Sequence, residues 1–134
     1  ASGFEFGEIK RSLTIGNLKI KCAKTIHNNE SIAYRFIEKE KSIVITGDCD
    51  YDINLIKFAK ECHLLLIECS FPNNMKFKGH LIPKECGEIA KQANVKKLIL
   101  THLYPISSKN TRLKETKKIF SNTILAKDLL TMKI

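Results

Sequence analysis

Three short runs of mainly aliphatic residues, each ending in a side chain with metal-binding or acid–base chemistry, constrain the fold of this chain most. They are residues 43–47 before Asp48, residues 64–67 before Glu68, and residues 97–101 before His102. Short apolar runs of this kind, rich in β-branched residues, are typical of buried strands. Gly47 permits a sharp backbone turn at the point where the first strand leaves the sheet.

The segments between these strands have the apolar spacing of amphipathic helices. Apolar residues recur at i, i+3, i+4 and i+7, first at Leu55, Phe58, Ala59 and Cys62, and again at Cys86, Ile89, Ala90 and Ala93. Strands that alternate with helices predict a parallel sheet with right-handed crossovers, in which sites form at the carboxyl ends of the strands. We therefore expect Asp48, Glu68 and His102 to lie at one rim of the sheet.

Other segments predict further strands and one more helix. Period-2 alternation of apolar residues from Phe4 to Cys22, and again over residues 31–38, predicts an antiparallel meander before the parallel units. Pro83 is well placed as the first residue of the second helix. A third helix is expected over residues 112–120, followed by two short closing strands at residues 123–126 and 129–132. The predicted fold class is α/β, with antiparallel strands followed by βαβαβ units.

Length and composition predict one globular domain. The chain has 134 residues, a hydrophobic fraction of 43% and a net charge of +9. It contains no stretch of the ~20 apolar residues that a membrane span needs and opens with no signal segment, so we expect a cytoplasmic protein without a membrane partner. Its five cysteines lack C-x-x-C spacing, which favours reduced thiols. The scattered positive charge favours an anionic substrate or nucleic acid over a cationic ligand.

Two more histidines lie in predicted loops. His27 is in the connection between two antiparallel strands, where a lone histidine is more often a surface residue than a ligand. His80 precedes the helix that begins at Pro83, and the free backbone N–H groups at a helix start favour anions such as phosphate. The alternative for His80 is a partly exposed loop residue without a function.

Four segments together resemble the carboxyl-terminal half of a metallo-β-lactamase-fold hydrolase. They are Thr46-Gly47-Asp48, Glu68-Cys69-Ser70, residues 79–90 beginning Gly79-His80-Leu81-Ile82-Pro83, and residues 98–105 around Thr101-His102. The resemblance extends in order and spacing over roughly residues 18 to 134 and points to the subgroup of ribonuclease Z and related phosphodiesterases. It implies half of an αββα sandwich, in which two sheets pack together with helices outside.

The resemblance implies a role for three of the histidines and for Asp48. His27 and His102 are expected as metal ligands, Asp48 as a carboxylate that bridges two metal ions, and His80 as the group that contacts the substrate or protonates the leaving oxygen. Zinc suits these ligands, and manganese or iron is also compatible. The implied activity is hydrolysis of an anionic small molecule or an RNA phosphodiester through a metal-activated water, with Asp48 and His80 as catalytic residues.

The chain lacks one segment of the family pattern and departs from the pattern at three further positions. It has no His-x-His-x-Asp-His segment, which in the family supplies further metal ligands from the amino-terminal half, so only part of the two-ion site is expected here. Cys49 replaces a threonine or serine after the aspartate and is interpreted as a small buried residue rather than a ligand for a soft metal. His63 replaces an acidic residue and is expected at the surface or at a strand end. Ile82 replaces the usual helix-capping threonine.

The absent segment leaves two function classes open. The first is a metal-dependent hydrolase whose site is only partly present, so that the isolated chain is weak or inactive. The second is a noncatalytic binding or assembly module derived from such a hydrolase. In both cases the inner sheet face would be an exposed apolar patch, which we expect the amino-terminal half or a second copy of the chain to cover. A fragment, a split-gene product and a dimeric half all fit the sequence.

Overall fold

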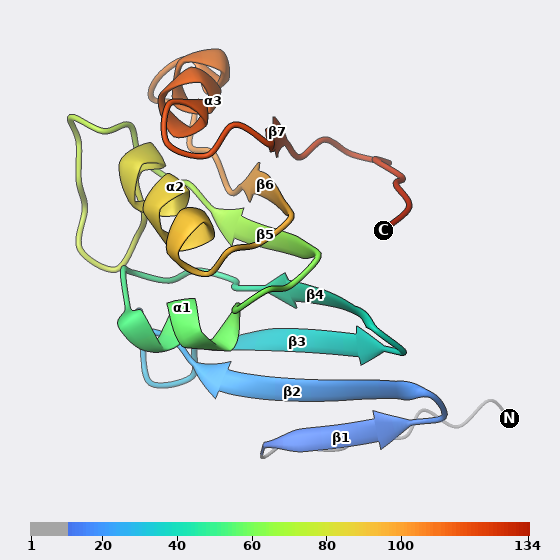
Figure 1. The fold of residues 1–134 in the computed structure, drawn as a ribbon. Coiled ribbons are helices and arrows are strands. Elements are labelled where there is room, and N and C mark those ends of the chain that lie inside the picture. Colours follow the sequence, from blue (N-terminus) through green and yellow to red (C-terminus); the bar gives the residue numbers. More distant parts are fainter. Residues whose placement is uncertain (1–10) are drawn as a thin grey trace, which may run out of the picture.

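The computed structural model describes residues 11–134, which form one seven-stranded sheet with helices on one face (Figure 1). The strands are β1 (Ser12–Ile15), β2 (Leu18–Lys24), β3 (Ile32–Glu38), β4 (Lys41–Ile45), β5 (Leu64–Glu68), β6 (Lys97–Thr101) and β7 (Thr123–Leu125). The helices are α1 (Ile53–Phe58), α2 (Pro83–Gln92) and α3 (Lys109–Lys117). Within the described residues, no helix has the length and apolar character needed to cross a membrane.

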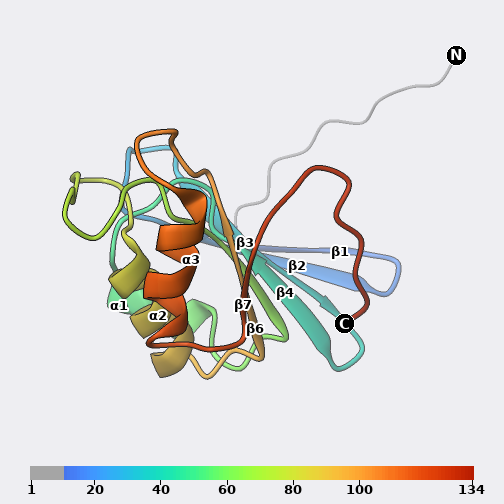
Figure 2. The same cartoon turned by 90° about the horizontal axis from the view of Figure 1, so that it is seen from above.

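The strands follow one another across the sheet in chain order. Pairs from β1 to β4 are antiparallel, and pairs from β4 to β7 are parallel. Because all the parallel connections step in the same direction, right-handed crossovers place α1, α2 and α3 on the same side of the sheet. Figure 2 shows this arrangement, with the segment after β7 on the opposite side. The predicted meander and βαβαβ units are therefore confirmed where the structure describes them, and the alternation predicted between Phe4 and Ile9 lies outside the described residues.

Two boundaries and one strand differ from the sequence-based expectation. Helix α1 ends at Phe58, and the turn that follows it closes at Glu61, which has a left-handed conformation (φ +57°). Of the expected apolar face, Leu55, Ala59 and Cys62 are buried and Phe58 is partly buried. Helix α3 begins at Lys109, where the Ser108 hydroxyl accepts a bond from the Thr111 N–H, and it ends at Lys117. The second closing strand, expected over 129–132, is wrong. Leu129 has a φ of +62° and is 99% exposed, so residues 129–132 do not form a strand and do not pair with the sheet.

The hydrophobic core lies between the sheet and the helices. Alternate residues of the parallel strands point to the helices and meet the predicted apolar face of α2, which begins at Pro83 as expected. The fully buried members of this layer include Val44, Leu65, Ile67, Leu98 and Leu100 from the strands and Cys86, Ile89 and Ala90 from α2. Each buried side chain of the Val, Leu or Ile type contributes about 1.5–3 kcal/mol.

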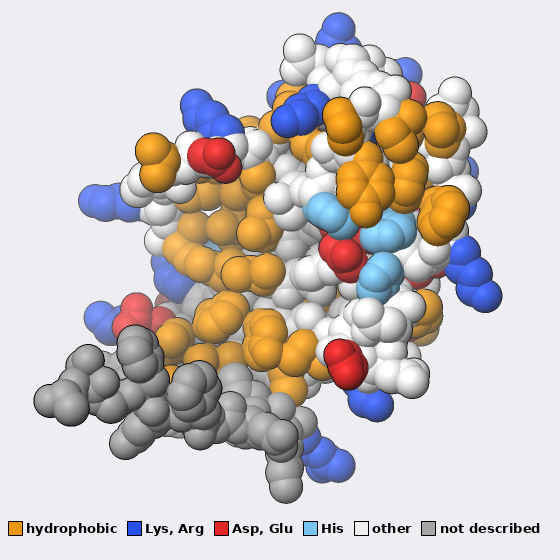
Figure 3. Space-filling view, turned by 180° about the vertical axis from the view of Figure 1, so that it is seen from behind, with side chains coloured by type: hydrophobic (Ala, Val, Ile, Leu, Met, Phe, Trp, Pro, Cys, Tyr) orange, Lys and Arg blue, Asp and Glu red, His pale blue; other side chains and the backbone are white. Residues whose placement is uncertain are grey.

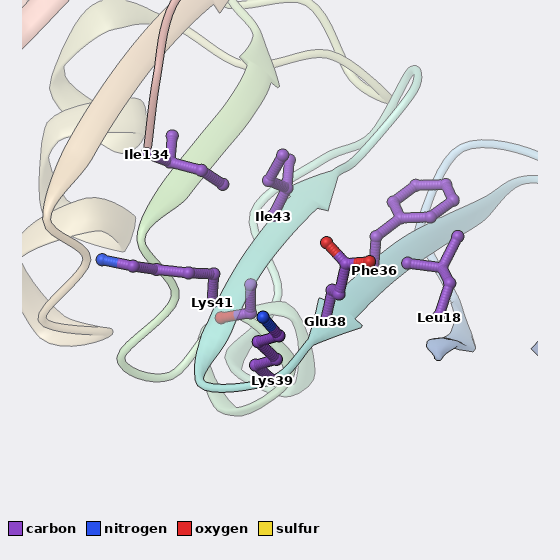
Figure 4. A pocket seen from close by; sticks show the side chains of 8 residues that line it. Leu18, Phe36, Glu38, Lys39, Lys41, Ile43 and Ile134 are labelled. Atoms are coloured by element: carbon purple, nitrogen blue, oxygen red, sulfur yellow. The ribbon is translucent and has the colours of Figure 1, made fainter. Parts of the chain in front are cut away.

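The opposite side of the sheet, which we call the helix-free face, is also apolar. Its residues are paired across neighbouring strands in two rows, Leu13–Ile20–Phe36–Ile43–Leu64 and Cys22–Tyr34–Ile45–Leu66–Ile99–Ile124. Figure 3 shows hydrophobic side chains gathered over this face. Ile134 lies against it and lines a pocket with Leu18, Phe36 and Ile43 (Figure 4).

Candidate metal centre

The carboxyl ends of three neighbouring parallel strands bring together residues that lie far apart in the sequence. Asp48 follows β4, Glu68 is the last residue of β5, and His102 comes directly after β6. The predicted placement at one rim is therefore confirmed. Two residues in the left-handed region turn the chain there: Gly47 has a φ of +61° and His102 a φ of +53°. For a residue with a side chain this conformation costs about 1–3 kcal/mol, and such strain is concentrated at functional sites.

The Asp48 carboxylate lies between two imidazoles. Its Oδ1 is 3.0 Å from His102 Nδ1, and its Oδ2 is 3.8 Å from His27 Nε2. The side chains remain accessible, with exposed fractions of 41% for Asp48, 35% for His102 and 24% for His27. The His27 loop is held beside Asp48 because the Asp50 N–H donates a 2.7 Å bond to the Ile26 carbonyl.

A backbone carbonyl determines which nitrogen of His27 is available to a ligand. Its Nδ1 lies 2.8 Å from the Gly79 carbonyl oxygen, which can only accept, so Nδ1 carries the proton. The other nitrogen, Nε2, then has its lone pair free on the side of Asp48. Gly79 is required for this contact, because its φ is +91° and a Cβ there would lie 3.2 Å from His27 Nδ1. The resemblance included Gly79 but gave no reason for it.

His80 is oriented by the buried carboxylate of Glu68. Its Nδ1 is 2.8 Å from Glu68 Oε1, and the Glu68 side chain is 1% exposed. Glu68 also accepts bonds from the backbone N–H groups of Cys49, Ser70 and Leu81 and from the Ser70 hydroxyl. Glu68 thus ends its strand at the rim, as predicted, but points inward. His80 is buried, at 8% exposed, rather than a partly exposed loop residue.

The Ser70 hydroxyl joins the two histidines of the rim. Its Oγ lies 3.2 Å from His80 Nδ1 and 3.1 Å from His102 Nδ1, and it donates a 2.7 Å bond to Glu68 Oε2. Sequence reasoning did not assign Ser70 a role. The only signal was its place within Glu68-Cys69-Ser70, directly after the predicted strand.

A salt-bridged loop anchor supports the backbone around Gly79 and His80. Lys76 Nζ lies 2.6 Å from Asp50 Oδ1 and 2.8 Å from Glu85 Oε2, and the Gly79 N–H donates a 2.7 Å bond to Asp50 Oδ2. Burial by itself raises the pKa of Asp50, but the bonds from Lys76 and Gly79 outweigh it and hold that pKa below its usual value. Burial likewise lowers the pKa of Lys76, yet its two carboxylate partners raise it overall. No sequence pattern indicated this anchor.

Three side chains at the rim could together bind a metal ion. Among residues 11–134, Asp48, His80 and His102 each offer a ligand atom, and these atoms all lie within 4.8 Å of one another. Imidazole nitrogen and carboxylate oxygen are ligands for zinc, manganese and iron. His27 adds a further nitrogen from outside this group, 3.8 Å from Asp48. The residues fit a divalent metal ion.

The three positions at which a residue departs from the family pattern have structural explanations. Cys49 is fully buried, and burial raises the pKa of its thiol to about 12, which agrees with a small buried residue. His63 lies at a strand end away from the rim, where its Nδ1 accepts a 3.2 Å bond from the Ser42 N–H. The Ile82 N–H donates to Glu85 Oε2 at 3.2 Å, so the glutamate caps the start of α2 without help from a threonine.

The sequence matches a known protein family and is similar to two curated proteins over most of its length. Residues 4–103 match the family described as the beta-lactamase superfamily domain. The ribonuclease Z of Archaeoglobus fulgidus is 37% identical over 100 residues, which cover 70% of this chain and 33% of that protein. The probable metallo-hydrolase YhfI of Bacillus subtilis is 34% identical over 114 residues, which cover 84% of this chain and 47% of YhfI. The chain thus spans about a third to a half of the length of these curated relatives.

Solved structures share the fold. The crystal structure of the metallo-beta-lactamase fold protein YhfI from Bacillus subtilis superposes with a TM-score of 0.84 at 33% identity, covering 90% of this chain and 52% of that one. The short form of human tRNase Z superposes with a TM-score of 0.72 at 23% identity, covering 92% of this chain and 47% of that one. The second likeness concerns the fold alone.

Proposed function

Because this chain belongs to the beta-lactamase superfamily and has its metallo-β-lactamase fold, we propose that it is the carboxyl-terminal half of a metal-dependent hydrolase. The observation that carries the proposal is the cluster of Asp48, His80 and His102 at adjacent strand ends. A purely structural rim would not need three polar side chains directed at one another.

We assign His27, Asp48 and His102 as the metal ligands of this half. Two ions are expected in the complete site, with zinc as the first choice and manganese or iron as alternatives. When bound, such ions supply Lewis-acid activation of a water molecule near neutral pH. The chain's own contribution is to keep the His27 Nε2 lone pair directed at Asp48, through the 2.8 Å contact of Nδ1 with Gly79.

His80 is the residue proposed to act on the leaving group. Glu68 Oε1, 2.8 Å from Nδ1, fixes the orientation of the ring, and Nε2 is the nitrogen proposed to carry a proton towards the substrate. That proton can pass to the departing oxygen, or Nε2–H can donate a hydrogen bond to developing negative charge. Glu68 positions His80 and does not itself contact the substrate.

The proposed substrate is a phosphodiester or a related ester, either an RNA or an anionic small molecule. Two observations support it: a relative that matches over 70% of this chain is named ribonuclease Z, and the chain carries a net charge of +9. An excess of positive charge attracts polyanions and speeds their association.

The remaining ligands are proposed to come from an amino-terminal half or from a second copy packed on the helix-free face. The chain contains no His-x-His-x-Asp-His segment and spans less than half of either curated relative. Ile45, on that face, exposes 36% of its surface. The isolated chain is therefore expected to have weak activity or none.

Metal content per chain is the direct test. We expect the purified protein, incubated with zinc and desalted, to retain about one ion or more by elemental analysis, and the Asp48→Ala variant to lose it. Glu40→Ala is the matched control, because Glu40 is an exposed carboxylate at the opposite end of the sheet. Equal metal retention by the wild type and by Asp48→Ala would contradict the assignment.

The alternative is a noncatalytic module derived from such a hydrolase, which the absent histidine segment favours. It predicts that neither the wild type nor Asp48→Ala retains metal. It also predicts that adding an amino-terminal half that carries the histidine segment produces no hydrolysis of bis(p-nitrophenyl) phosphate. Hydrolysis by the completed protein that falls on His80→Ala substitution would exclude it.

A further inference from the structure

Three aromatic residues, Phe71, Phe77 and Tyr104, form a cluster beside the candidate metal centre, which we call the aromatic wall. The Phe71 ring stacks on Phe77 with centroids 5.4 Å apart and an interplanar angle of 27°. On another side Phe71 meets Tyr104 edge-on, at 5.1 Å and 82°. The wall combines the loop that follows β5 with the segment that follows β6.

The aromatic wall directly adjoins the histidines of the site. The His80 ring centroid lies 5.6 Å from Phe71 and 6.4 Å from Phe77, and His102 lies 5.0 Å from Tyr104. Figure 3 shows hydrophobic side chains next to the histidines and the acidic residue at this rim. A phosphate held by His80 would therefore place its neighbouring group against the wall.

Phe77 is exposed in a way that packing does not explain. Although it stacks on Phe71, 61% of its surface is accessible, and nearby in sequence Met75 is 46% exposed. A large aromatic side chain gains most from burial, so an open ring face beside polar catalytic groups indicates a contact surface.

The wall is held in place before any ligand arrives. Arg112, which is fully buried, donates to the carbonyls of Cys69, Ser70 and Tyr104, and so ties together the two segments that carry the rings. The His80 N–H donates a 3.1 Å bond to the Phe77 carbonyl. A surface that needs no ordering on binding loses less free energy when it takes up a ligand.

An exposed lysine, Lys78, directly follows Phe77 in the sequence. Lys78 is exposed and makes no hydrogen bond or ion pair with any part of the chain that the structure describes, whereas Lys76 is held by Asp50 and Glu85. A base stacks on an aromatic ring whatever its identity, and a lysine attracts the backbone phosphate beside it.

We propose that Phe77 is the stacking surface for the nucleobase next to the scissile phosphate, with Lys78 facing the flanking phosphate. This inference rests on the proposed phosphodiester function, because it specifies a nucleotide as the substrate of the same site. Phe71 is a positioning residue that stacks on the Phe77 ring, and Tyr104 packs against Phe71 from another side.

Binding of two probes separates the base from the phosphate. The 134-residue chain, loaded with zinc, is titrated with adenosine 5′-monophosphate and with ribose 5-phosphate, and binding is followed by NMR shifts and calorimetry. We expect the nucleotide to bind at least about fivefold more tightly, with shifts in the Phe77 ring resonances. Phe77→Ala should remove this preference, and Phe77→Trp should retain it.

Ile15→Ala is the matched control, because Ile15 is 59% exposed and lies on β1 beside the hairpin at the far end of the sheet. Equal binding of the two probes by the wild type would overturn the proposal, and so would an unchanged preference in Phe77→Ala. The first outcome is also the one expected if another part of the protein covers Phe77. The measurement does not depend on turnover. A base preference without hydrolysis, in protein completed with an amino-terminal half that carries the histidine segment, would contradict the catalytic proposal alone. Hydrolysis by that completed protein without a base preference would contradict this one alone.

Discussion

At the level of single residues, Glu68 shows how this chain keeps a buried charge. Its two carboxylate oxygens accept from three backbone N–H groups, the Ser70 hydroxyl and His80, at distances between 2.7 and 3.1 Å. A buried carboxylate is tolerated only when its lone pairs are satisfied in this way. The donors come from the segments that follow β4 and β5 and from the loop before α2, so Glu68 joins three separate segments behind the metal centre.

Replacing Glu68 by glutamine tests this arrangement. Glutamine has the same volume as glutamate, but its NH₂ group would replace one carboxylate oxygen. That group cannot accept the hydrogen bonds which the oxygen accepted, so at least one buried N–H is left unpaired. We expect the free energy of unfolding to fall by about 1–3 kcal/mol, the cost of leaving a buried donor unpaired. Urea unfolding measures it. The control, Glu61→Gln at an exposed site, should change stability by less than about 0.5 kcal/mol.

Asp50 makes a pH-dependent contribution to stability. Its pKa is lowered in the folded protein, against the effect of burial, by the bonds from Lys76 and Gly79, relative to a reference of 3.8. The unfolded state therefore binds its proton first as the pH falls, so the contribution is complete above pH 3.8 and is lost as the pH drops through the folded value.

We expect Asp50→Asn to unfold at a lower urea concentration than the wild type at pH 7, with the difference shrinking below about pH 4. Unfolding curves between pH 2.5 and 7 measure this, with the exposed Asp128→Asn as control. A stability difference that stays constant over that range would show that the charge of Asp50 is not what stabilises the loop.

At the level of elements, the contact between α2 and α3 depends on one glycine. A Cβ built at Gly87 would lie 2.8 Å from Ile119 Cβ and 3.2 Å from the Thr116 carbonyl oxygen. The small residue therefore lets the turn that follows α3 approach α2 more closely than any side chain would allow. This packing also fixes the position of Arg112 on α3, and through it the two segments that carry the aromatic wall.

Substitution of Gly87 by alanine should destabilise the protein although alanine favours helices. Overpacking costs about 1–3 kcal/mol, which exceeds the gain of up to about 1 kcal/mol in helix propensity. The midpoint of thermal unfolding measures the net effect. Adding Ile119→Ala should restore only part of the loss, because the Thr116 carbonyl is backbone. Lys91→Ala, an exposed position on the same helix, is the control, and a Gly87→Ala protein of unchanged or higher stability would contradict the close packing.

At the level of the whole molecule, the sheet is covered by helices on one side only. The helix-free face contains Leu13 at 41% exposure and Ile45 at 36%, each within one of its two continuous rows of apolar residues. Apolar patches of this extent on soluble proteins mark interaction surfaces. The comparison with the two curated relatives also favours an interaction surface on this face, because more than half of each relative has no counterpart in this chain.

We expect the isolated chain to associate as its concentration rises, and a double substitution of Phe36→Lys and Ile45→Lys to reduce that association. Two lysines placed on the helix-free face would have to be desolvated in any sheet-to-sheet contact. Sedimentation velocity measures the change, and circular dichroism checks that the fold is kept. Ile53→Lys, at a 62% exposed site on α1, is the control. A monomer at all concentrations in both proteins would show that this face drives no self-association.

The outline of the fold could be predicted because it follows from local patterns. Apolar runs and helical spacing located the parallel strands, α1 and α2, and Pro83 marked the start of α2 correctly. The false strand at 129–132 shows the limit of that method. A short apolar run reads as a strand whether or not a neighbouring edge is available, and here Leu129 takes a left-handed φ instead.

The rim could be predicted in part. Asp48, Glu68 and His102 were expected together because parallel strands end at the same edge, but their separation depended on a strand order that no local pattern encodes. That β4, β5 and β6 are direct neighbours makes the 3.0 Å approach of His102 to Asp48 possible.

The sequence by itself determined the types of residue delivered to the rim, the alternation of strands and helices, and the family resemblance. Only the tertiary structure decided that Glu68 turns inward to orient His80, that Ser70 joins two histidines, and that Gly79 sets the tautomer of His27 across 52 residues of chain. The physical reason is that strand and helix patterns arise from neighbours along the chain, whereas hydrogen bonds and close approaches between distant segments exist only after the chain has packed.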